Sequence, residues 1–395
     1  MKIYADNAAT TKMSQRAIQA MLPYMSEIYG NPSSLHSEGQ RAAEALADAR
    51  RRIAGLLGAQ ENEILFTSGG SESDNQAILS AARLGERAGK KHIISSGIEH
   101  HAVLHTLDRL KKEGFEITLL DTGEDGILQA DQVAGAIRPD TCLVTVMYAN
   151  NEIGTIQPIK EIGAVCREKG VLFHTDGVQA AGHIPIHVEE DHIDMLSISA
   201  HKFHGPKGIG VLYARKGIPL ISLIEGGAQE RGKRAGTENI PAIMGMAEAF
   251  EEALEHLEEK NEKLTGLRER LIDGLSEIPH CILNGDRERR LPGNVSFCFE
   301  GIEGEAMLLL LDDKGICASS GSACTSGSLE PSHVLLAIGR PHEIAHGSLR
   351  LSLSEENTEE EVDYIISGVK EVTAYLRGIS PVWRALENGE QKFIL

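Results

Sequence analysis

The stretch "KHIISSGIEHHAVLHTLDRLKKEGFEITLL" (residues 91–120) reads as a strand, a helix and a second strand in direct succession. Short apolar runs at 91–96 and 115–120 are typical of strands, and the segment between them, from about 101 to 113, is typical of a helix. The same alternation extends from about residue 63 to residue 214. It predicts an α/β fold with a largely parallel sheet and helices on the faces of that sheet.

The pattern changes in the second half of the chain. From about Ala247 to Leu275, leucines fall mostly three or four residues apart among many Glu and Lys residues. This spacing predicts one long amphipathic helix that joins two domains. Further strand-like and helix-like segments follow and predict a smaller α+β unit, with segments at 293–300, 303–311, 315–320, 348–354 and 358–377.

Composition limits the classes of function. The chain has 395 residues, of which 39 are basic and 58 acidic, and its formal charge is −19. This charge disfavours direct binding to nucleic acid and leaves small molecules or basic protein surfaces as expected partners. No apolar run is long enough to cross a bilayer, and the start "MKIYADNAATT" lacks signal-peptide character. Six cysteines without C-x-x-C pairs are typical of reduced, intracellular proteins, so we expect a soluble cytoplasmic protein without membrane association.

A lysine follows one of the predicted strands. In "SISAHKFHGPKG" (197–208), Lys202 stands directly after the strand, close to Ser199 and His201. A lysine held partly out of water has a lowered pKa and can serve as a Schiff-base amine. A structural lysine is an equal alternative on this pattern alone.

A carboxylate follows another predicted strand. In "FHTDGVQAAG" (173–182), Asp176 ends an apolar run and Gln179 lies one helical turn further on. A carboxylate at this edge of the sheet can pair with the pyridine nitrogen of pyridoxal phosphate and keep it protonated. The alternative is that Asp176 caps a helix.

The segment "TSGGSESDN" (67–75) places small residues where a predicted strand ends and a helix begins. Backbone N–H groups and the positive end of the helix dipole make such a turn a phosphate site, and Ser71 adds a hydroxyl group. The turn matches neither G-x-G-x-x-G nor a P-loop. It therefore favours a single phosphate monoester over a dinucleotide or nucleoside triphosphate.

Two further strand ends are polar, "GIEHHAV" (97–103) and "YANNEIG" (148–154). A histidine in the first can stack on a flat ring or move protons. The adjacent asparagines of the second suit a ring hydroxyl or a substrate carboxylate, although loop asparagines are usually turn formers. His101 and His105, four residues apart, are also a metal-pair hypothesis, but no third ligand stands nearby in the sequence.

Together these stretches resemble the cysteine desulfurases of the class V aminotransferase family, which are pyridoxal phosphate enzymes of fold type I. The resemblance covers nearly the whole chain. The segment "SSGSACTSGSLEPSHVL" (319–335) is similar to the NifS/IscS-like branch with the longer cysteine loop. The resemblance implies a large cofactor-binding domain over residues 16–259. It also implies a small domain, made of residues 1–15 with 260–395, that carries a mobile cysteine loop at about 317–332.

The resemblance also implies a role for each matching residue. Lys202 would hold the cofactor covalently, Asp176 would pair with its ring nitrogen, and His100 would stack on the ring and shuttle protons. Further cofactor ligands would be Gly70, Ser71, Asn150, Gln179, Ser199 and His201, with Thr237 reaching the cofactor phosphate of the other subunit in a homodimer. Arg350 would bind the substrate carboxylate, with Asn150 also contacting the substrate.

The sequence departs from the family pattern at three places. Gly70-Ser71 stands where Ala-Thr is common, Ala200 where Gly is common, and His101 follows His100. None of these removes a group that the chemistry requires, and the first bears on one phosphate contact.

The implied reaction converts L-cysteine to L-alanine. Cys324, as a thiolate, would attack the sulfur of the substrate and retain it as a persulfide, and the small residues around it would let it reach both the cavity and an acceptor. The resemblance implies a sulfur-acceptor protein such as an iron–sulfur scaffold, with tRNA thiolation as a further destination. Whether Cys324 also ligates an iron–sulfur cluster shared with that partner stays open here.

Other functions compete with this interpretation. Selenocysteine lyase and cysteine sulfinate desulfinase are close alternatives. A zinc metallopeptidase is a different class, because His342, Glu343 and His346 in "HEIAH" match H-E-x-x-H. Pro341 precedes this segment and a strand-like run follows it, whereas the zinc motif needs a sustained helix and a third ligand. A scaffold that holds a cluster would need grouped cysteines, which the sequence lacks.

Overall fold

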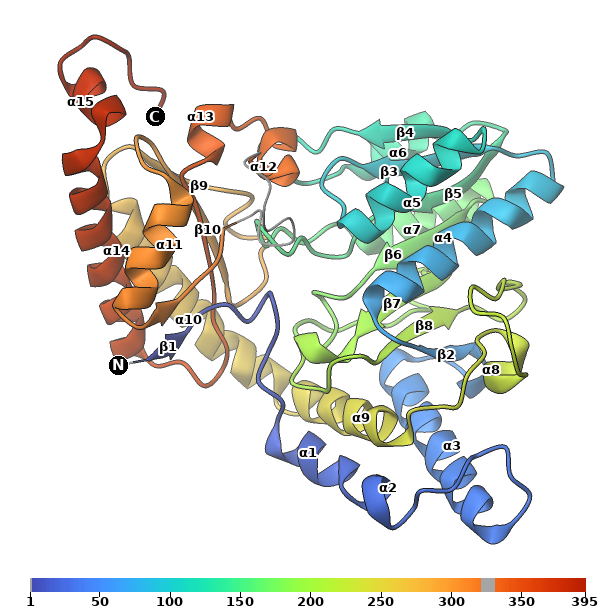
Figure 1. Ribbon diagram of the computed structural model, residues 1–395. Helices are drawn as coiled ribbons and strands as arrows, with labels where there is room; N and C mark the ends of the chain where they lie inside the picture. The colour runs from blue at the N-terminus through green and yellow to red at the C-terminus, as the bar shows by residue number, and fades with distance from the viewer. Residues whose placement is uncertain (1, 321–330) are drawn as a thin grey trace.

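A seven-stranded sheet forms the centre of the larger part of the molecule (Figure 1). The computed structural model describes residues 2–320 and 331–395. The strands are β2 (Ile64–Thr67), β3 (His92–Ser96), β4 (Glu116–Leu120), β5 (Thr141–Thr145), β6 (Leu172–Asp176), β7 (Met195–Ser199) and β8 (Gly210–Ala214). Their order is β2-β8-β7-β6-β5-β3-β4. Strand β8 runs antiparallel to both of its neighbours, β2 and β7, and the other neighbouring pairs in this sheet are parallel. The prediction of a mainly parallel α/β sheet is confirmed.

Helices cover both faces of this sheet. Successive strand residues point to opposite faces, so Leu65 and Leu143 pack against α4 and α5, whereas Ile64 and Val144 pack on the opposite face with α3, α7 and α9. The helices of this part are α1 (Gln15–Met21), α2 (Pro23–Ser26), α3 (Ser37–Leu57), α4 (Gly70–Arg87), α5 (His101–Lys112), α6 (Ala130–Ala136), α7 (Ile159–Lys169), α8 (Gln229–Gly232) and α9 (Ile240–Leu254).

The smaller part has its own apolar core. Its strands are β1 (Ile3–Tyr4), β9 (Cys281–Leu283), β10 (Asn294–Phe299), β11 (Ile316–Cys317) and β12 (Ser348–Ser352). Its helices are α10 (Leu257–Ser276), α11 (Gly304–Asp313), α12 (His333–Ala337), α13 (His342–Ala345), α14 (Glu359–Ile379) and α15 (Pro381–Glu387). The antiparallel sheet β12-β10-β9 packs with α10, α11 and α14, and β1 pairs with β11, so the N-terminus joins this core. The boundaries of the two domains stay a prediction.

The single long helix expected over 247–275 is wrong. Two helices, α9 and α10, meet at His256, whose φ of 54° and ψ of 30° are left-handed. Such a backbone conformation interrupts the right-handed helical path. No proline or glycine marks the break in the sequence, and the leucine spacing continues across it. The two helices still run from one part of the molecule to the other (Figure 1).

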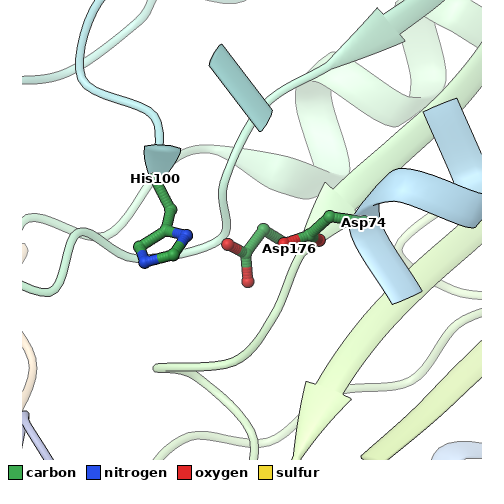
Figure 2. Close-up of side chains that lie close together, drawn as sticks. All are labelled: Asp74, His100 and Asp176. Atoms are coloured by element: carbon green, nitrogen blue, oxygen red, sulfur yellow. The ribbon is translucent and has the colours of Figure 1, made fainter. Parts of the chain in front are cut away.

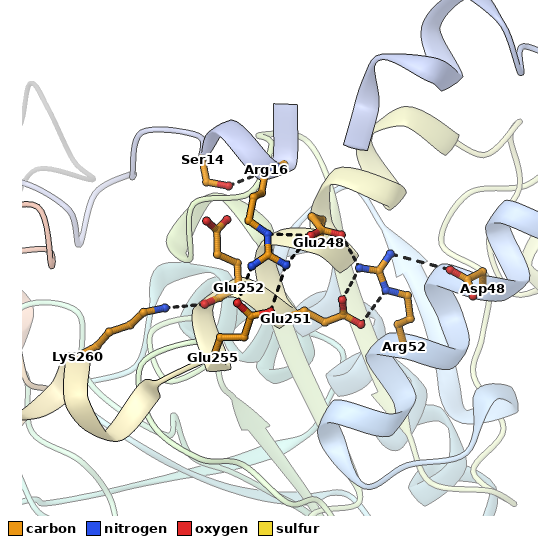
Figure 3. A network of polar contacts seen from close by, with 10 residues as sticks. Ser14, Arg16, Asp48, Arg52, Glu248, Glu251, Glu252, Glu255 and Lys260 are labelled. Atoms are coloured by element: carbon orange, nitrogen blue, oxygen red, sulfur yellow. Dashed lines mark hydrogen bonds and ion pairs between the residues drawn. The ribbon is translucent and has the colours of Figure 1, made fainter. Parts of the chain in front are cut away.

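Acidic side chains of α9 connect it to the N-terminal helices (Figure 3). Arg16 of α1 and Arg52 of α3 each lie 2.7 Å from Glu248. Arg16 also contacts Glu255, and Arg52 also contacts Glu251. These ion pairs hold α1, and the chain that precedes it, beside the large core.

Helix α3 was not expected from the sequence, although the sequence contains an amphipathic helical pattern there. Small and apolar residues recur along one side of 37–57, and the buried ones include Ala42, Ala49, Ile53 and Leu57. Gly58 ends the helix in a left-handed conformation, with φ of 68°.

Among the described helices, none combines the length and apolar character needed to cross a membrane.

Candidate active site

A cavity of about 310 Å³ lies where the carboxyl ends of the central strands meet the small domain. Nine of the side chains or glycines singled out in the sequence line it, which are Gly70, Ser71, His100, Asp176, Gln179, Ser199, His201, Lys202 and Arg350. They come from strand ends and helix starts far apart in the chain. The fold therefore gathers them at the edge of the sheet where α/β proteins bind ligands.

Lys202 ends a short 3-10 turn, Ala200–Lys202, that follows β7. Its Nζ atom donates hydrogen bonds to the carbonyl oxygens of Ala8, at 2.6 Å, and Ala9, at 2.8 Å. The same N-terminal segment binds the lysine turn again, because the backbone N–H of Thr11 donates to the carbonyl oxygen of His201. The amine is thus oriented by carbonyl groups inside the cavity.

Asp176 is the last residue of β6 and is only 6% exposed. Its Oδ1 atom accepts a hydrogen bond from the backbone N–H of Val178 at 3.0 Å. Burial raises the pKa of this carboxyl group, while nearby His100 opposes the rise. A cationic ring nitrogen in the cavity would favour the ionised form of Asp176.

His100 caps α5, and its Nδ1 atom accepts from the backbone N–H of Ala102 at 3.1 Å. Burial lowers the pKa of this imidazole. Figure 2 shows its ring beside the carboxyl groups of Asp176 and Asp74, and the three side chains offer ligand atoms within 4.8 Å of one another.

Asp74, in the first turns of α4, was not predicted as a site residue. It is 1% exposed and lines the cavity, and its Oδ1 atom has no hydrogen-bond partner among the described residues. Its Oδ1 atom lies 3.6 Å from His174 Nε2, but burial lowers the pKa of His174 to about 3 and leaves that ring neutral. Burial and the neighbouring Asp176 raise the pKa of Asp74 well above its ordinary value. The sequence gives no signal for this, because Asp74 stands among polar residues at a helix start.

The start of α4 suits a phosphate group. Gly69 has φ of 151°, and a Cβ atom at Gly70 would lie 2.6 Å from Val178 Cγ2, so in this chain the Val178 side chain occupies the space that a side chain at position 70 would need. Thr10 Oγ1 lies 3.1 Å from His201 Nδ1, and burial lowers the pKa of His201 to about 4. An 18-residue helix begins here, and within the described part of the chain no side chain caps its N-terminus, which is the arrangement that binds phosphate.

The structure places the asparagines of "YANNEIG" differently from the expectation. The side chain of Asn150 is fully buried, and its Oδ1 atom accepts from the backbone N–H groups of Glu152 and Ile153 at 2.8 and 2.9 Å. Its Nδ2 atom donates to the carbonyl oxygen of Ile98 at 2.9 Å. Asn151, not Asn150, is among the residues that line the cavity. The contact of Asn150 with cofactor and substrate stays a prediction.

Arg350, in β12, is 2% exposed and brings a cation from the small domain into the cavity. Its Nη2 atom lies 2.9 Å from Asp6 Oδ1, and its Nη1 atom donates to the carbonyl oxygen of Asn151 at 3.1 Å. Its Nε atom is buried without a hydrogen-bond partner in the described part of the chain. The guanidinium is therefore fixed from one side and retains a donor for an anion.

Gln179 lines the cavity, and its Nε2 atom donates to the carbonyl oxygen of Ala8 at 2.9 Å. Thr237 and Cys324 are the last two predicted residues. Thr237 is exposed and is not among the residues that line the cavity of its own chain. Cys324 lies outside the described residues.

The "HEIAH" segment does not form a sustained helix. His342 begins α13, which has four residues, and β12 begins at Ser348 shortly after His346. The helix needed to present both histidines of a zinc peptidase is therefore missing from this described segment.

The cavity combines a strand-end lysine, a buried carboxylate and a phosphate turn, and it lies at the edge of an α/β sheet of this topology. Together these features define a pyridoxal phosphate enzyme of fold type I. Comparison with known proteins agrees, because the family model for aminotransferase class-V matches residues 3–365. The chain is 55% identical to the cysteine desulfurase IscS of Methanosarcina thermophila, over 96% of this chain and 94% of the relative. It is 52% identical to the cysteine desulfurase IscS of Clostridium botulinum, over 99% of both chains.

Solved structures are similar as well. One described as a NifS-like protein superposes with a TM-score of 0.89 at 39% identity, over 95% of this chain and all of the other. Another, described as SspA in complex with cysteine, gives a TM-score of 0.79 at 38% identity, over 90% and 99% of the two chains. The chain belongs to the class-V aminotransferase family and, within it, to the cysteine desulfurases.

Proposed function

We propose that this protein converts L-cysteine to L-alanine and transfers the sulfur to its own Cys324. The observation that carries the proposal is the convergence of Lys202, Asp176 and Arg350 on one cavity. This set supplies an amine, a partner for a ring nitrogen and a clamp for an α-carboxylate, which is what an amino acid substrate and pyridoxal phosphate require. The cysteine present in the structure described as SspA in complex with cysteine supports L-cysteine as the substrate.

Different residues around the cavity would bind different parts of the cofactor. Asp176 would hold the ring nitrogen in its protonated form, His100 would stack on the ring, and Gln179 would contact the ring oxygen. The phosphate ligands would be Gly70, Ser71, Ser199, His201 and, across a homodimer, Thr237. Lys202 would hold the cofactor covalently at rest. When bound, pyridoxal phosphate supplies an electron sink for the substrate's α-carbon.

Two groups act on the substrate itself. Arg350 binds the α-carboxylate with the donors that Asp6 and Asn151 leave free. Lys202 removes the α-proton, because its amine is oriented by the carbonyl oxygens of Ala8 and Ala9 inside the cavity. His100 lines the cavity and can accept a proton there, because burial lowers the pKa of its imidazole and so favours the neutral form.

The sulfur transfer is a displacement at sulfur. A bond forms between the Cys324 sulfur and the substrate sulfur, and the carbon–sulfur bond breaks with its electron pair remaining on carbon, which is then protonated to give alanine. The products are alanine and a persulfide on Cys324. Three of the other cysteines are poor nucleophiles, because burial raises the pKa of Cys142 and Cys298 to about 11 and that of Cys166 to about 12.

A persulfide on Cys324 must pass its sulfur to an acceptor molecule. We infer a homodimer, completed by Thr237, in the cytoplasm, with a sulfur-acceptor protein such as an iron–sulfur scaffold as the recipient. A thiolation pathway for tRNA is a second recipient, and Cys324 is a candidate ligand of a cluster shared with the scaffold. The names of the curated relatives support cysteine as the sulfur source, and they leave the recipient to experiment.

The test uses the purified full chain. Addition of L-cysteine should change its visible spectrum and yield alanine and, with a reductant, sulfide. Cys324→Ser should keep the visible spectrum and lose sulfide release. A Cys324→Ser protein that releases sulfide at the wild-type rate would contradict the proposal. Selenocysteine and cysteine sulfinate, assayed in parallel, test the two neighbouring activities.

A further inference from the structure

Both described ends of the segment that carries Cys324 are attached beside the active-site cavity. At the first end, Ser319 forms an antiparallel bridge with Arg350, with N–O distances of 2.6 and 3.1 Å. At the second end, His333 Nε2 lies 2.9 Å from the carbonyl oxygen of Glu99, and the hydroxyl group of Ser332 donates to the carboxylate of Glu152. The second attachment therefore depends on side chains.

The contact between Ser332 and Glu152 joins residues 180 positions apart in the chain. Glu152 is 6% exposed and Ser332 is 4% exposed. Ser332 also caps α12, because its Oγ atom accepts from the backbone N–H groups of Val334 and Leu335 at 3.1 and 3.4 Å. Its own proton goes to Glu152, so loss of Glu152 would leave a buried donor without an acceptor.

Glu152 belongs to the turn that also contacts the substrate clamp. Its backbone N–H donates to Asn150 Oδ1 at 2.8 Å, and the carbonyl oxygen of the preceding Asn151 accepts from Arg350 Nη1 at 3.1 Å. The turn at 150–153 thus contacts Arg350 through its backbone and Ser332 through the Glu152 side chain. One turn therefore contacts both the substrate site and the second end of the cysteine segment.

We propose that Glu152 is a positioning residue for sulfur transfer, which fixes the Ser332 end of the cysteine segment to the turn that holds Arg350. This inference rests on the proposed function, because it takes Cys324 as the acceptor of sulfur. Glu152 exchanges no proton or electron in the step, in which the new sulfur–sulfur bond replaces the carbon–sulfur bond. It acts by fixing Ser332, at the described end of the cysteine segment, relative to the turn that holds Arg350, which raises the effective concentration of the Cys324 thiol at the substrate sulfur.

The experiment separates substrate binding from sulfur transfer in the cofactor-loaded full chain. Glu152→Leu, Ser332→Ala and their combination remove the hydrogen bond, whereas Glu152→Gln keeps an acceptor. One single-turnover readout is the change in the visible spectrum on mixing with cysteine, and the other is persulfide formed on Cys324, measured by alkylation and mass spectrometry. Ser380→Ala is the matched control, because Ser380 caps α15 and accepts from Trp383 N, far from Glu152 in the sequence.

We expect Glu152→Leu and Ser332→Ala to keep the spectral step at its wild-type rate and to slow persulfide formation about tenfold, as for the loss of one buried hydrogen bond. The double variant should be no slower than the slower single variant, and Glu152→Gln and Ser380→Ala should behave as wild type. Wild-type persulfide formation in Glu152→Leu, or equal slowing of both steps, would overturn the inference. Should Glu152→Leu fail to fold, Ser332→Ala decides by the same criteria. Persulfide on a residue other than Cys324 in the wild type would instead contradict the proposed function.

Discussion

The carboxyl groups of Asp74 and Asp176 lie within 4.8 Å of one another in a buried part of the cavity wall (Figure 2). Two carboxylates at this separation, away from water, strongly disfavour double ionisation. His174 cannot compensate them, because burial keeps it neutral. The proposed pairing of Asp176 with a ring nitrogen would give Asp176 a cationic partner, and the retained proton would then belong on Asp74.

In the protein without cofactor, burial and the neighbouring Asp176 already raise the pKa of Asp74, so Asp74→Asn should stabilise the cofactor-free protein in a pH-dependent way. Below the ordinary pKa of aspartate, about 3.9, Asp74 is protonated in both the folded and the unfolded state. As pH rises above that value, the unfolded chain releases the proton while the folded protein keeps it, so the wild type loses stability until the raised pKa of Asp74 is passed.

The advantage of Asp74→Asn over the wild type should grow with pH across that window, by up to about 1.4 kcal/mol per pH unit. Urea unfolding of both proteins at several pH values above about 5 measures it. An advantage that is constant with pH would show that Asp74 is ionised in the folded state.

Lys202→Ala should give a folded protein that loses its visible absorbance on dialysis. The substitution removes the amine that we propose binds the cofactor covalently, while the backbone hydrogen bond from Thr11 to His201 in the lysine turn remains. Absorbance spectra and circular dichroism before and after dialysis measure colour and fold. Lys216→Ala, at an exposed lysine after β8, is the control that should stay coloured.

Arg350→Lys should lower kcat/KM for L-cysteine by about 10- to 100-fold, as expected for a lost charge-assisted hydrogen bond of ~1.5–3 kcal/mol. An ammonium group cannot contact Asp6, Asn151 and a carboxylate in the fork geometry of a guanidinium. Steady-state kinetics measure the loss. Asp6→Asn, which weakens only the support of Arg350, should lose less, and a larger loss for Asp6→Asn would reverse the assigned roles.

Gly70→Ala should weaken cofactor binding, because its Cβ atom would lie 2.6 Å from Val178 Cγ2 and shift the phosphate turn. The dissociation constant for pyridoxal phosphate, measured by titration of the cofactor-free protein, should rise. Gly55→Ala is the matched control, since a Cβ atom there meets nothing within 4 Å. In the last turn of α3 this control should raise stability by at most about 0.5–1 kcal/mol and leave cofactor affinity unchanged. Equal affinity in both variants would show that the turn tolerates the methyl group.

Local sequence pattern was sufficient for the regular elements of the large domain. The strands and helices predicted between 63 and 214 appear within a few residues of their expected positions, because alternating burial on a covered sheet imposes a recognisable apolar pattern. The pattern failed at His256, where a left-handed backbone divides the predicted helix without a residue type that favours it. Tertiary contacts decide such a conformation, and apolar spacing does not record them.

The sequence by itself determined the chemistry, since Lys202, Asp176 and the phosphate turn stand at strand ends that a parallel sheet must bring to one edge. Only the tertiary structure placed Asp74 in the cavity wall and Glu152 in contact with Ser332, and showed that Asn151 lines the cavity where Asn150 was expected. Their properties come from burial and from partners up to 180 residues away. A buried carboxyl group is defined by the charges and donors around it, and those neighbours are assembled only when the chain folds.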